Sequence, residues 1–341
     1  MTLAAFRQLS PDEQKMIVIE AISRRLEHSK NLHFEIEILA WAHDNRDRPP
    51  IEPSDDPARR IHNRRFQAWL LDGSYFMERK TFSRQARSTF SESNIAESLV
   101  PVETVCTSWN AEVGVNRGHV RQSHVPSRTD ARIDTKEDEM VVIGNRYWYW
   151  LDGKRSKFGE PFLQYLYNNR DEISVDATDE NGETVTISVP WAPYWDHKPM
   201  GETRLLLDPA KGFMPVKTYG HWENAVSGIW RIQENIVIES RLIGDVWMPT
   251  NLQEVTRSNH HEPDTATVYS MTVLSIEQGT VRPEDLHVSF PEGATVIDAI
   301  KRAGYRVGKN GEETDVEFLV DNSEVFGANA VYTPCGLRNA E

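Results

Sequence analysis

The chain has 341 residues, of which 39% are hydrophobic and 26% charged, and its formal net charge is −14. This length allows one large β domain or two smaller ones with a sizeable core. The acidic balance disfavours nucleic-acid binding, which needs clustered Lys and Arg, and it disfavours docking on an anionic lipid surface. No apolar run is long enough for a transmembrane helix, so we do not expect an integral membrane protein.

The first predicted element is an amphipathic helix over residues 10–28. Ser10, Pro11 and Glu13 supply a cap, a first-turn proline and a capping-box acid in the right order. The apolar stripe that follows leaves Arg24 and Arg25 on the polar side. The segment that precedes the helix does not read as a signal peptide, so the protein is either cytoplasmic or follows a signal that has been removed.

The rest of the chain is dominated by strand patterns. Residues 32–42 alternate between apolar and polar side chains, as in a strand with one wet face. Asp72–Gly73 and Asn181–Gly182 fit two-residue hairpin turns, and Gly244–Asp245 fits a turn with glycine first. A short helix is predicted over 160–169. With at least ten strand candidates and no βαβ alternation, the sequence predicts a mainly β, α+β fold.

These elements are expected to form one domain. The meander from Glu202 to Glu277 reads as the later half of a curved sheet that begins near Phe34. We therefore predict a single domain over residues 1–305, with a loosely ordered tail over 306–341.

Candidate chemistry in the sequence is sparse. His260, His261, Glu262 and Asp264 have the side chains of metal ligands, but neighbouring His on a polar loop point apart, and a solvated loop tip is the simpler interpretation. His119 and His124 lack an evident partner. Neither a nucleophile elbow nor a phosphate loop is present. We predict no catalytic residue, no metal and no cofactor.

Two further candidates stay open. Asp196–His197, in an aromatic loop, is the best candidate pair if the protein has an active site. Cys106 and Cys335 could pair in an oxidising compartment, but the simpler interpretation is two free buried thiols.

Several segments resemble the LolA/LolB-type lipoprotein-carrier superfamily in its long bacterial form. The matching stretches are "NLHFEIEI", "FQAWLLDGSYFMER", "LLLDPAKGFMPVKTYGHWE" and "IVIESRLIGDVWMPTNLQEV", and "TSWNAEVGV" matches with Ala111 in place of a glycine. Asp208, Gly212 and Pro215 fit a strand, a turn and a returning strand, while Gly244 to Thr250 fit the element G-x-W-[FYM]-P-T. The similarity covers roughly residues 10–290.

This resemblance implies an incomplete β-barrel, a strongly curved antiparallel sheet with helices on its concave face. It also implies an apolar cavity that holds acyl chains, and a periplasmic or otherwise extracytoplasmic location. Our first hypothesis is a non-enzymatic carrier of a lipid, an acyl chain or a lipoprotein. The alternatives are a sensing or scaffold module that binds a protein partner and, less favoured, a hydrolase that uses Asp196 and His197.

Strand aromatic side chains are the expected wall of such a cavity. The chain has ten Trp, which is high, and their simplest role is core packing. From strand parity we select the following ligand-contacting residues: Phe34, Trp69, Tyr147, Trp150, Trp230 and Trp247.

Overall fold

The computed structural model describes residues 2–44, 49–53, 59–82, 101–122, 129–135, 162–177, 183–190, 200–223, 227–259 and 265–315. Its helices are α1 (Leu3–Arg7), α2 (Pro11–Ser29) and α5 (Phe162–Asn168), with 3₁₀ turns η2 (Arg170–Glu172), η3 (Pro209–Lys211) and η4 (Pro283–Leu286). The first-half strands are β1 (Asn31–Asp44), β2 (Arg60–Leu71), β3 (Ser74–Phe82), β4 (Glu103–Asn110), β5 (Val115–Gln122), β6 (Thr129–Asp134), β7 (Ser174–Asp176) and β8 (Val185–Val189). The remaining strands are β9 (Met200–Asp208), β10 (Met214–Glu223), β11 (Trp230–Ile243), β12 (Val246–Ser258), β13 (Thr265–Gln278), β14 (Thr295–Asp298), β15 (Ala303–Val307) and β16 (Glu313–Asp315).

The local signals in the sequence form the predicted elements. At the start of α2 the Glu13 carboxylate accepts from the Ser10 N–H at 2.8 Å, and the Ser10 hydroxyl accepts from the Glu13 N–H at 3.4 Å. This capping box satisfies two backbone donors that a helix start otherwise leaves unpaired. The β2–β3 turn has positive φ at Asp72 (48°) and Gly73 (85°), as a type I′ turn requires. Gly244, with φ 62°, begins the β11–β12 turn.

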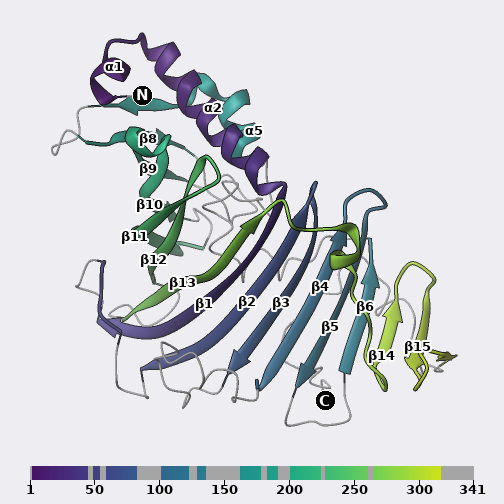
Figure 1. Ribbon diagram of the computed structural model, residues 1–341. Helices are drawn as coiled ribbons and strands as arrows, with labels where there is room; N and C mark the ends of the chain where they lie inside the picture. The colour runs from purple at the N-terminus through teal and green to yellow at the C-terminus, as the bar shows by residue number, and fades with distance from the viewer. Residues whose placement is uncertain are drawn as a thin grey trace.

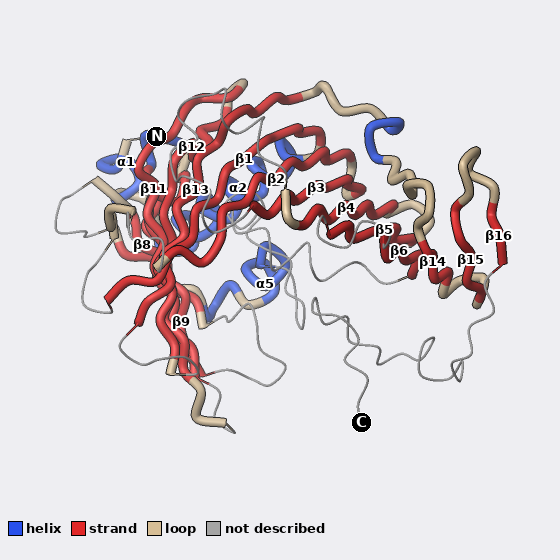
Figure 2. Tube along the Cα trace, turned by 90° about the horizontal axis from the view of Figure 1, so that it is seen from below, coloured by secondary structure: helices blue, strands red, loops and turns tan. Residues whose placement is uncertain are grey.

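The sixteen strands of the described residues belong to one sheet, in the order β16-β15-β14-β6-β5-β4-β3-β2-β1-β13-β12-β11-β10-β9-β8-β7. The sheet is open and curled rather than closed (Figures 1 and 2), which confirms the predicted fold class. One pairing is parallel: β14 lies beside β6 in the same direction. The reason is the long connection after β13, which returns the chain to the far edge instead of forming a hairpin.

The helices lie on the concave side of the sheet. Figure 2 shows α5 inside the curve. Apolar side chains of α1, α2 and α5 pack against β7, β8 and β9 in a cluster that includes Phe6, Ile19, Leu166, Ile187 and Leu205. The helix α2 is thereby stabilised by burial of its apolar stripe, which a lone helix of this length needs in water.

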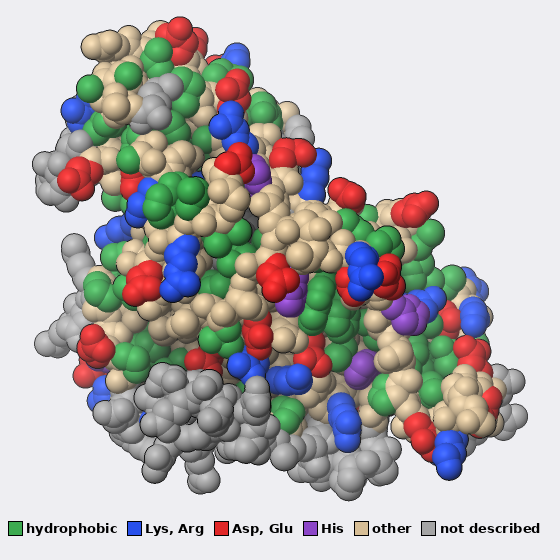
Figure 3. Space-filling model, in the orientation of Figure 1, with side chains coloured by type: hydrophobic (Ala, Val, Ile, Leu, Met, Phe, Trp, Pro, Cys, Tyr) green, Lys and Arg blue, Asp and Glu red, His purple; other side chains and the backbone are tan. Residues whose placement is uncertain are grey.

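Two connecting segments cover parts of the convex side. The connection from β13 to β14 buries Val281 and Val288, and Phe290 meets His119 edge to face at 6.4 Å. At the other end, Ile51 is clamped over β12 by the side chain of Gln253. In the view of Figure 3, acidic, basic and apolar side chains are interspersed on the surface.

The predicted boundary of the domain at residue 305 stays a prediction. The sheet continues through β15 to β16, which pairs with β15 from Tyr305↔Asp315 to Val307↔Glu313. Most of the predicted tail, residues 316–341, lies outside the described part of the chain.

Candidate ligand-binding face

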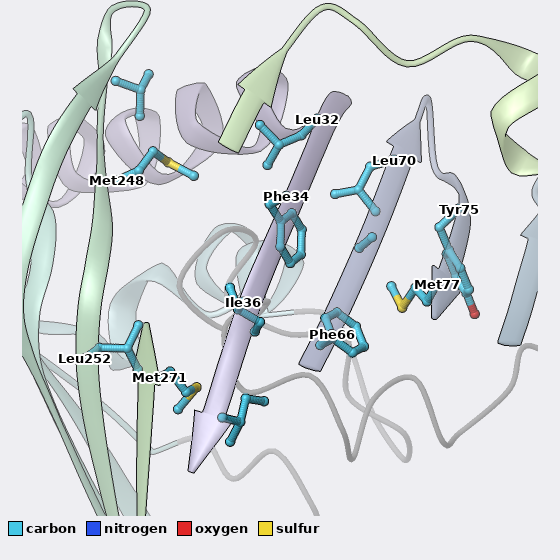
Figure 4. Packing of buried hydrophobic residues seen from close by; sticks show 13 residues of the cluster. Leu32, Phe34, Ile36, Phe66, Leu70, Tyr75, Met77, Met248, Leu252 and Met271 are labelled. Carbon is cyan, nitrogen blue, oxygen red and sulfur yellow. The ribbon is translucent and has the colours of Figure 1, made fainter. Parts of the chain in front are cut away.

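The concave side of β1, β2 and β3 carries a continuous apolar surface. Along β1, buried residues alternate with half-buried ones, because alternate side chains of a strand point to opposite faces. Phe34 lies opposite Ala68 of β2, which lies opposite Met77 of β3. We call the cluster of buried residues on this side the concave cluster (Figure 4): Leu32, Phe34, Ile36, Ile38, Phe66, Ala68, Leu70, Tyr75, Met77, Val246, Met248, Leu252 and Met271.

The sheet divides at one end of this cluster. Strands β12 and β13 pair only from Asn251↔Thr272 to Thr256↔Thr267. Beyond that point, the start of β12 stays with β11 and the end of β13 stays with β1, so the two halves of the sheet diverge (Figure 1). We call these two diverging stretches, the start of β12 and the end of β13, the arms. Met248 on the β12 arm and Leu32 of β1, beside the β13 arm, nevertheless belong to the same cluster.

The last turn of α2 bridges the two arms. His28 Nε2 lies 2.9 Å from an Asp245 carboxylate oxygen in the β11–β12 turn. His28 Nδ1 lies 2.7 Å from the amide nitrogen of Gln278 at the end of β13. A neutral ring that donates from Nε2 and accepts at Nδ1 satisfies both contacts. The helix end therefore ties the tips of the diverging strands together.

Next to the apolar surface, the concave side of β10, β11 and β12 is polar and buried. The Asn235 amide donates to the Thr218 hydroxyl at 2.6 Å, and the Thr256 hydroxyl donates to the Glu254 carboxylate at 2.9 Å. Glu254 is only 1% exposed. These hydrogen bonds give the buried polar groups partners. The polar band begins at Glu254, two residues beyond Leu252, so it borders the concave cluster on β12.

The aromatic residues selected from the sequence do not share one face. Phe34 lies in the concave cluster. Trp69 is opposite His33 and stacks on its ring at 4.7 Å, on the convex side. Trp247 lies under the Lys211 ammonium, 5.4 Å from its ring centroid, and Trp230 is half-buried at the start of β11. Tyr147 and Trp150 lie outside the described residues.

The structure adds little to the candidates for chemistry. Asp196, His197, His124, Cys335 and the cluster from His260 to Asp264 all lie outside the described residues. Within the described ranges, no group of three or more His, Cys, Asp or Glu could hold a metal ion. Burial lowers the pKa of His119, and Cys106 is a buried free cysteine whose pKa burial raises to about 12. A thiol in that state is a poor nucleophile.

Glu37 gives the fold a pH dependence that can be measured. On the convex side of β1 it lies opposite Arg65, which pairs with Glu35 at 2.6 Å. Burial raises the pKa of Glu37 from 4.5 to about 7, with Arg65 opposing the shift. The folded state therefore binds this proton more tightly than the unfolded state. The resulting stabilisation is complete below pH 4.5 and lost as pH rises through 7.

We expect Glu37→Gln to flatten the pH dependence of the unfolding free energy between pH 4.5 and 7. The variant should also exceed the wild type in stability at slightly alkaline pH, where the wild-type carboxylate is ionised. Urea unfolding across this range checks it. Two parallel curves would show that Glu37 does not titrate in this way.

Comparisons with known proteins identify no family. No family model matches the sequence, and no curated protein matches it. A solved DUF1329 family protein from Desulfovibrio piger ATCC 29098 is 8% identical, with a TM-score of 0.41 over 82% of this chain and 100% of that chain. The Pseudomonas aeruginosa MucA/MucB complex structure gives 9% identity and a TM-score of 0.21 over 77% of this chain and 99% of that chain.

None of the helices among the described residues is long and apolar enough to cross a membrane.

Proposed function

We propose that this protein is a non-enzymatic binding protein that holds the apolar chain of a lipid against the concave cluster. The observation that carries the proposal is a continuous apolar surface on one side of an open sheet, which joins Met248 and Leu252 of β12 with Leu32 and Phe34 of β1 in one cluster. Such a surface offers an alkyl chain a full set of apolar contacts once the chain enters.

Three methionines make this surface adaptable. Met77, Met248 and Met271 come from three different strands and are all buried. The unbranched, polarizable Met side chain fills irregular gaps and repacks readily around different partners. The cluster is buried in this structure, so a ligand must displace its present packing, and Met side chains lower the cost of that exchange.

The divergence of β12 and β13 supports a route to the cluster. Between the arms the sheet has no β12–β13 backbone pairing, so separating them breaks no hydrogen bond of the ladder there. His28 and its two contacts close the tips. We infer that the alkyl chain of a ligand passes between the arms when the last turn of α2 moves.

The proposal includes an extracytoplasmic location, which the resemblance to lipoprotein carriers supports. Fractionation of cells that carry the full gene would test it, and recovery of the protein only with cytoplasmic markers would oppose it.

Chain-length dependence is the test of the binding function. Octanoate, decanoate and dodecanoate, each below its critical micelle concentration, are titrated calorimetrically into the protein. Burial of one methylene is worth about 0.8 kcal/mol, so affinity should rise roughly fourfold per CH₂. An affinity that does not change with chain length, or no saturable binding of any chain, would refute the proposal.

A matched pair of variants locates the binding. Met77→Gln puts an amide into the concave cluster, and we expect it to weaken dodecanoate binding about tenfold or more. Met16→Gln makes the same change on the outer part of α2, where Met16 meets Arg170, and should leave binding unchanged. Equal effects of the two variants on dodecanoate affinity would show that the alkyl chain binds outside the concave cluster.

A further inference from the structure

Arg25 in α2 carries a buried charge. Its side chain is 5% exposed, and within the described part of the chain its Nε makes no hydrogen bond. No carboxylate or carbonyl of the described residues forms an ion pair or hydrogen bond with it. Burial lowers the pKa of Arg25 to about 10, and no acid among the described residues opposes this shift. Native proteins seldom bury a charge without a partner, so this arrangement calls for an explanation.

The position of Arg25 follows from helical geometry. Residues three or four apart share one side of a helix, so Arg25 lies on the same stripe as Val18 and Ile22 before it and His28 after it. Val18 and Ile22 are buried in the cluster that anchors α2 to the sheet. His28 contacts Asp245 and Gln278 at the tips of the diverging arms. Arg25 therefore lies one helical turn from His28, where we infer that the alkyl chain of a ligand enters between the arms.

The helix itself does not account for this charge. A cation near the C-terminal end of a helix is favoured by the helix dipole, but that effect is small beside the cost of removing a guanidinium from water. A purely structural role would be met better by an apolar side chain of similar length. A bound anion would supply the missing charge and accept from the planar fork of donors, as carboxylates and phosphates do.

We propose that Arg25 binds the anionic head group, a carboxylate or a phosphate, of a single-chain amphiphile whose tail lies on the concave cluster. This inference rests on the proposed function and names its ligand class. The head group would lie beside α2 at the divergence of β12 and β13, and the tail would extend along β1 toward Met271.

The test compares three ligands with the same tail: decanoate, decyl phosphate and decanol, titrated at neutral pH below their aggregation concentrations. We expect the wild type to bind at least one of the anions about tenfold or more tightly than the alcohol. The better-bound anion identifies carboxylate or phosphate as the head group. In Arg25→Met this preference should disappear, while the affinity for decanol stays the same.

Arg24 provides the matched control, because it is exposed on the same turn of α2. Arg24→Met should keep the full preference for the anions. Removing a buried unpaired charge should not impair folding, and a melting curve checks this; Arg25→Gln serves as a second variant.

If the wild type binds anions and alcohol equally, or if Arg25→Met keeps the preference, the role of Arg25 is refuted and the carrier function stands on its chain-length dependence. If no alkyl compound binds, the proposed function fails, and this inference fails with it.

Discussion

Phe34→Ala is expected to lower the free energy of unfolding by roughly 3–5 kcal/mol, as large-to-small changes at filled core positions do. The Phe34 ring is completely buried, and its centroid lies 6.1 Å from that of Phe66. Truncation removes the transfer free energy of the ring and leaves a cavity at the middle of the concave cluster. Chemical denaturation of the two proteins measures the difference.

Phe76→Ala is the control for this change. Phe76 is a half-buried phenylalanine on the convex side of β3, 5.0 Å from the Trp69 ring. Because water already reaches part of this ring, its loss should cost clearly less than that of Phe34. If Phe76→Ala cost as much or more, the concave cluster would not be the main core of β1–β3.

Gln253→Ala should lower the free energy of unfolding by about 2–5 kcal/mol, because it leaves two buried backbone groups without their hydrogen-bond partner. The Gln253 side chain is 3% exposed, its Oε1 accepts from the Ile51 N–H at 2.6 Å, and its Nε2 donates to the Ile51 carbonyl at 2.7 Å. It thus holds Ile51 over Trp41 and Val255 in a small apolar cluster on the convex side. Thermal and urea unfolding measure the cost, and amide exchange at Ile51 should accelerate.

Gln233→Ala gives the comparison. Gln233 is also buried, but its Oε1 has no hydrogen-bond partner in the described part of the chain. Truncation there removes an unsatisfied acceptor, so the loss should be smaller than at Gln253. Equal losses at both positions would mean that the clamp on Ile51 contributes nothing beyond packing.

Much of the fold could be predicted because its signals are local. Ser10, Pro11 and Glu13 define the start of α2, and the turn at Asp72–Gly73 needs residues that accept positive φ. Alternation over residues 32–42 predicts β1 and its wet face. Each of these depends only on neighbours in the sequence, so the amino-acid types carry enough information.

What could not be predicted depends on distant parts of the chain. The pairing of β1 with β13, and the parallel pairing of β14 with β6, are set by packing rather than by local sequence. Strand parity led us to select Trp69 together with Phe34 for one wall, but the register places Trp69 beside His33 on the other side. The site residues therefore stay predictions, apart from the placement of Phe34 in the concave cluster.

The expectation that Arg25 stays on the polar side of the helix is wrong: its side chain is buried. Residue type favoured a solvated position, since Arg is seldom buried without a partner. The missed signal was spacing, because Arg25 follows Ile22 by three residues and Val18 by seven.

The most direct test of a lipid-binding concave face is ¹³C-methyl methionine NMR of the protein titrated with decanoate. Met77, Met248 and Met271 lie in the concave cluster, while Met16 lies on α2 beside Arg170. Decanoate should shift the three concave methyl signals with one common saturation curve and leave the Met16 signal in place. Unchanged concave signals at saturating decanoate, or shifts confined to Met16, would contradict binding on this face.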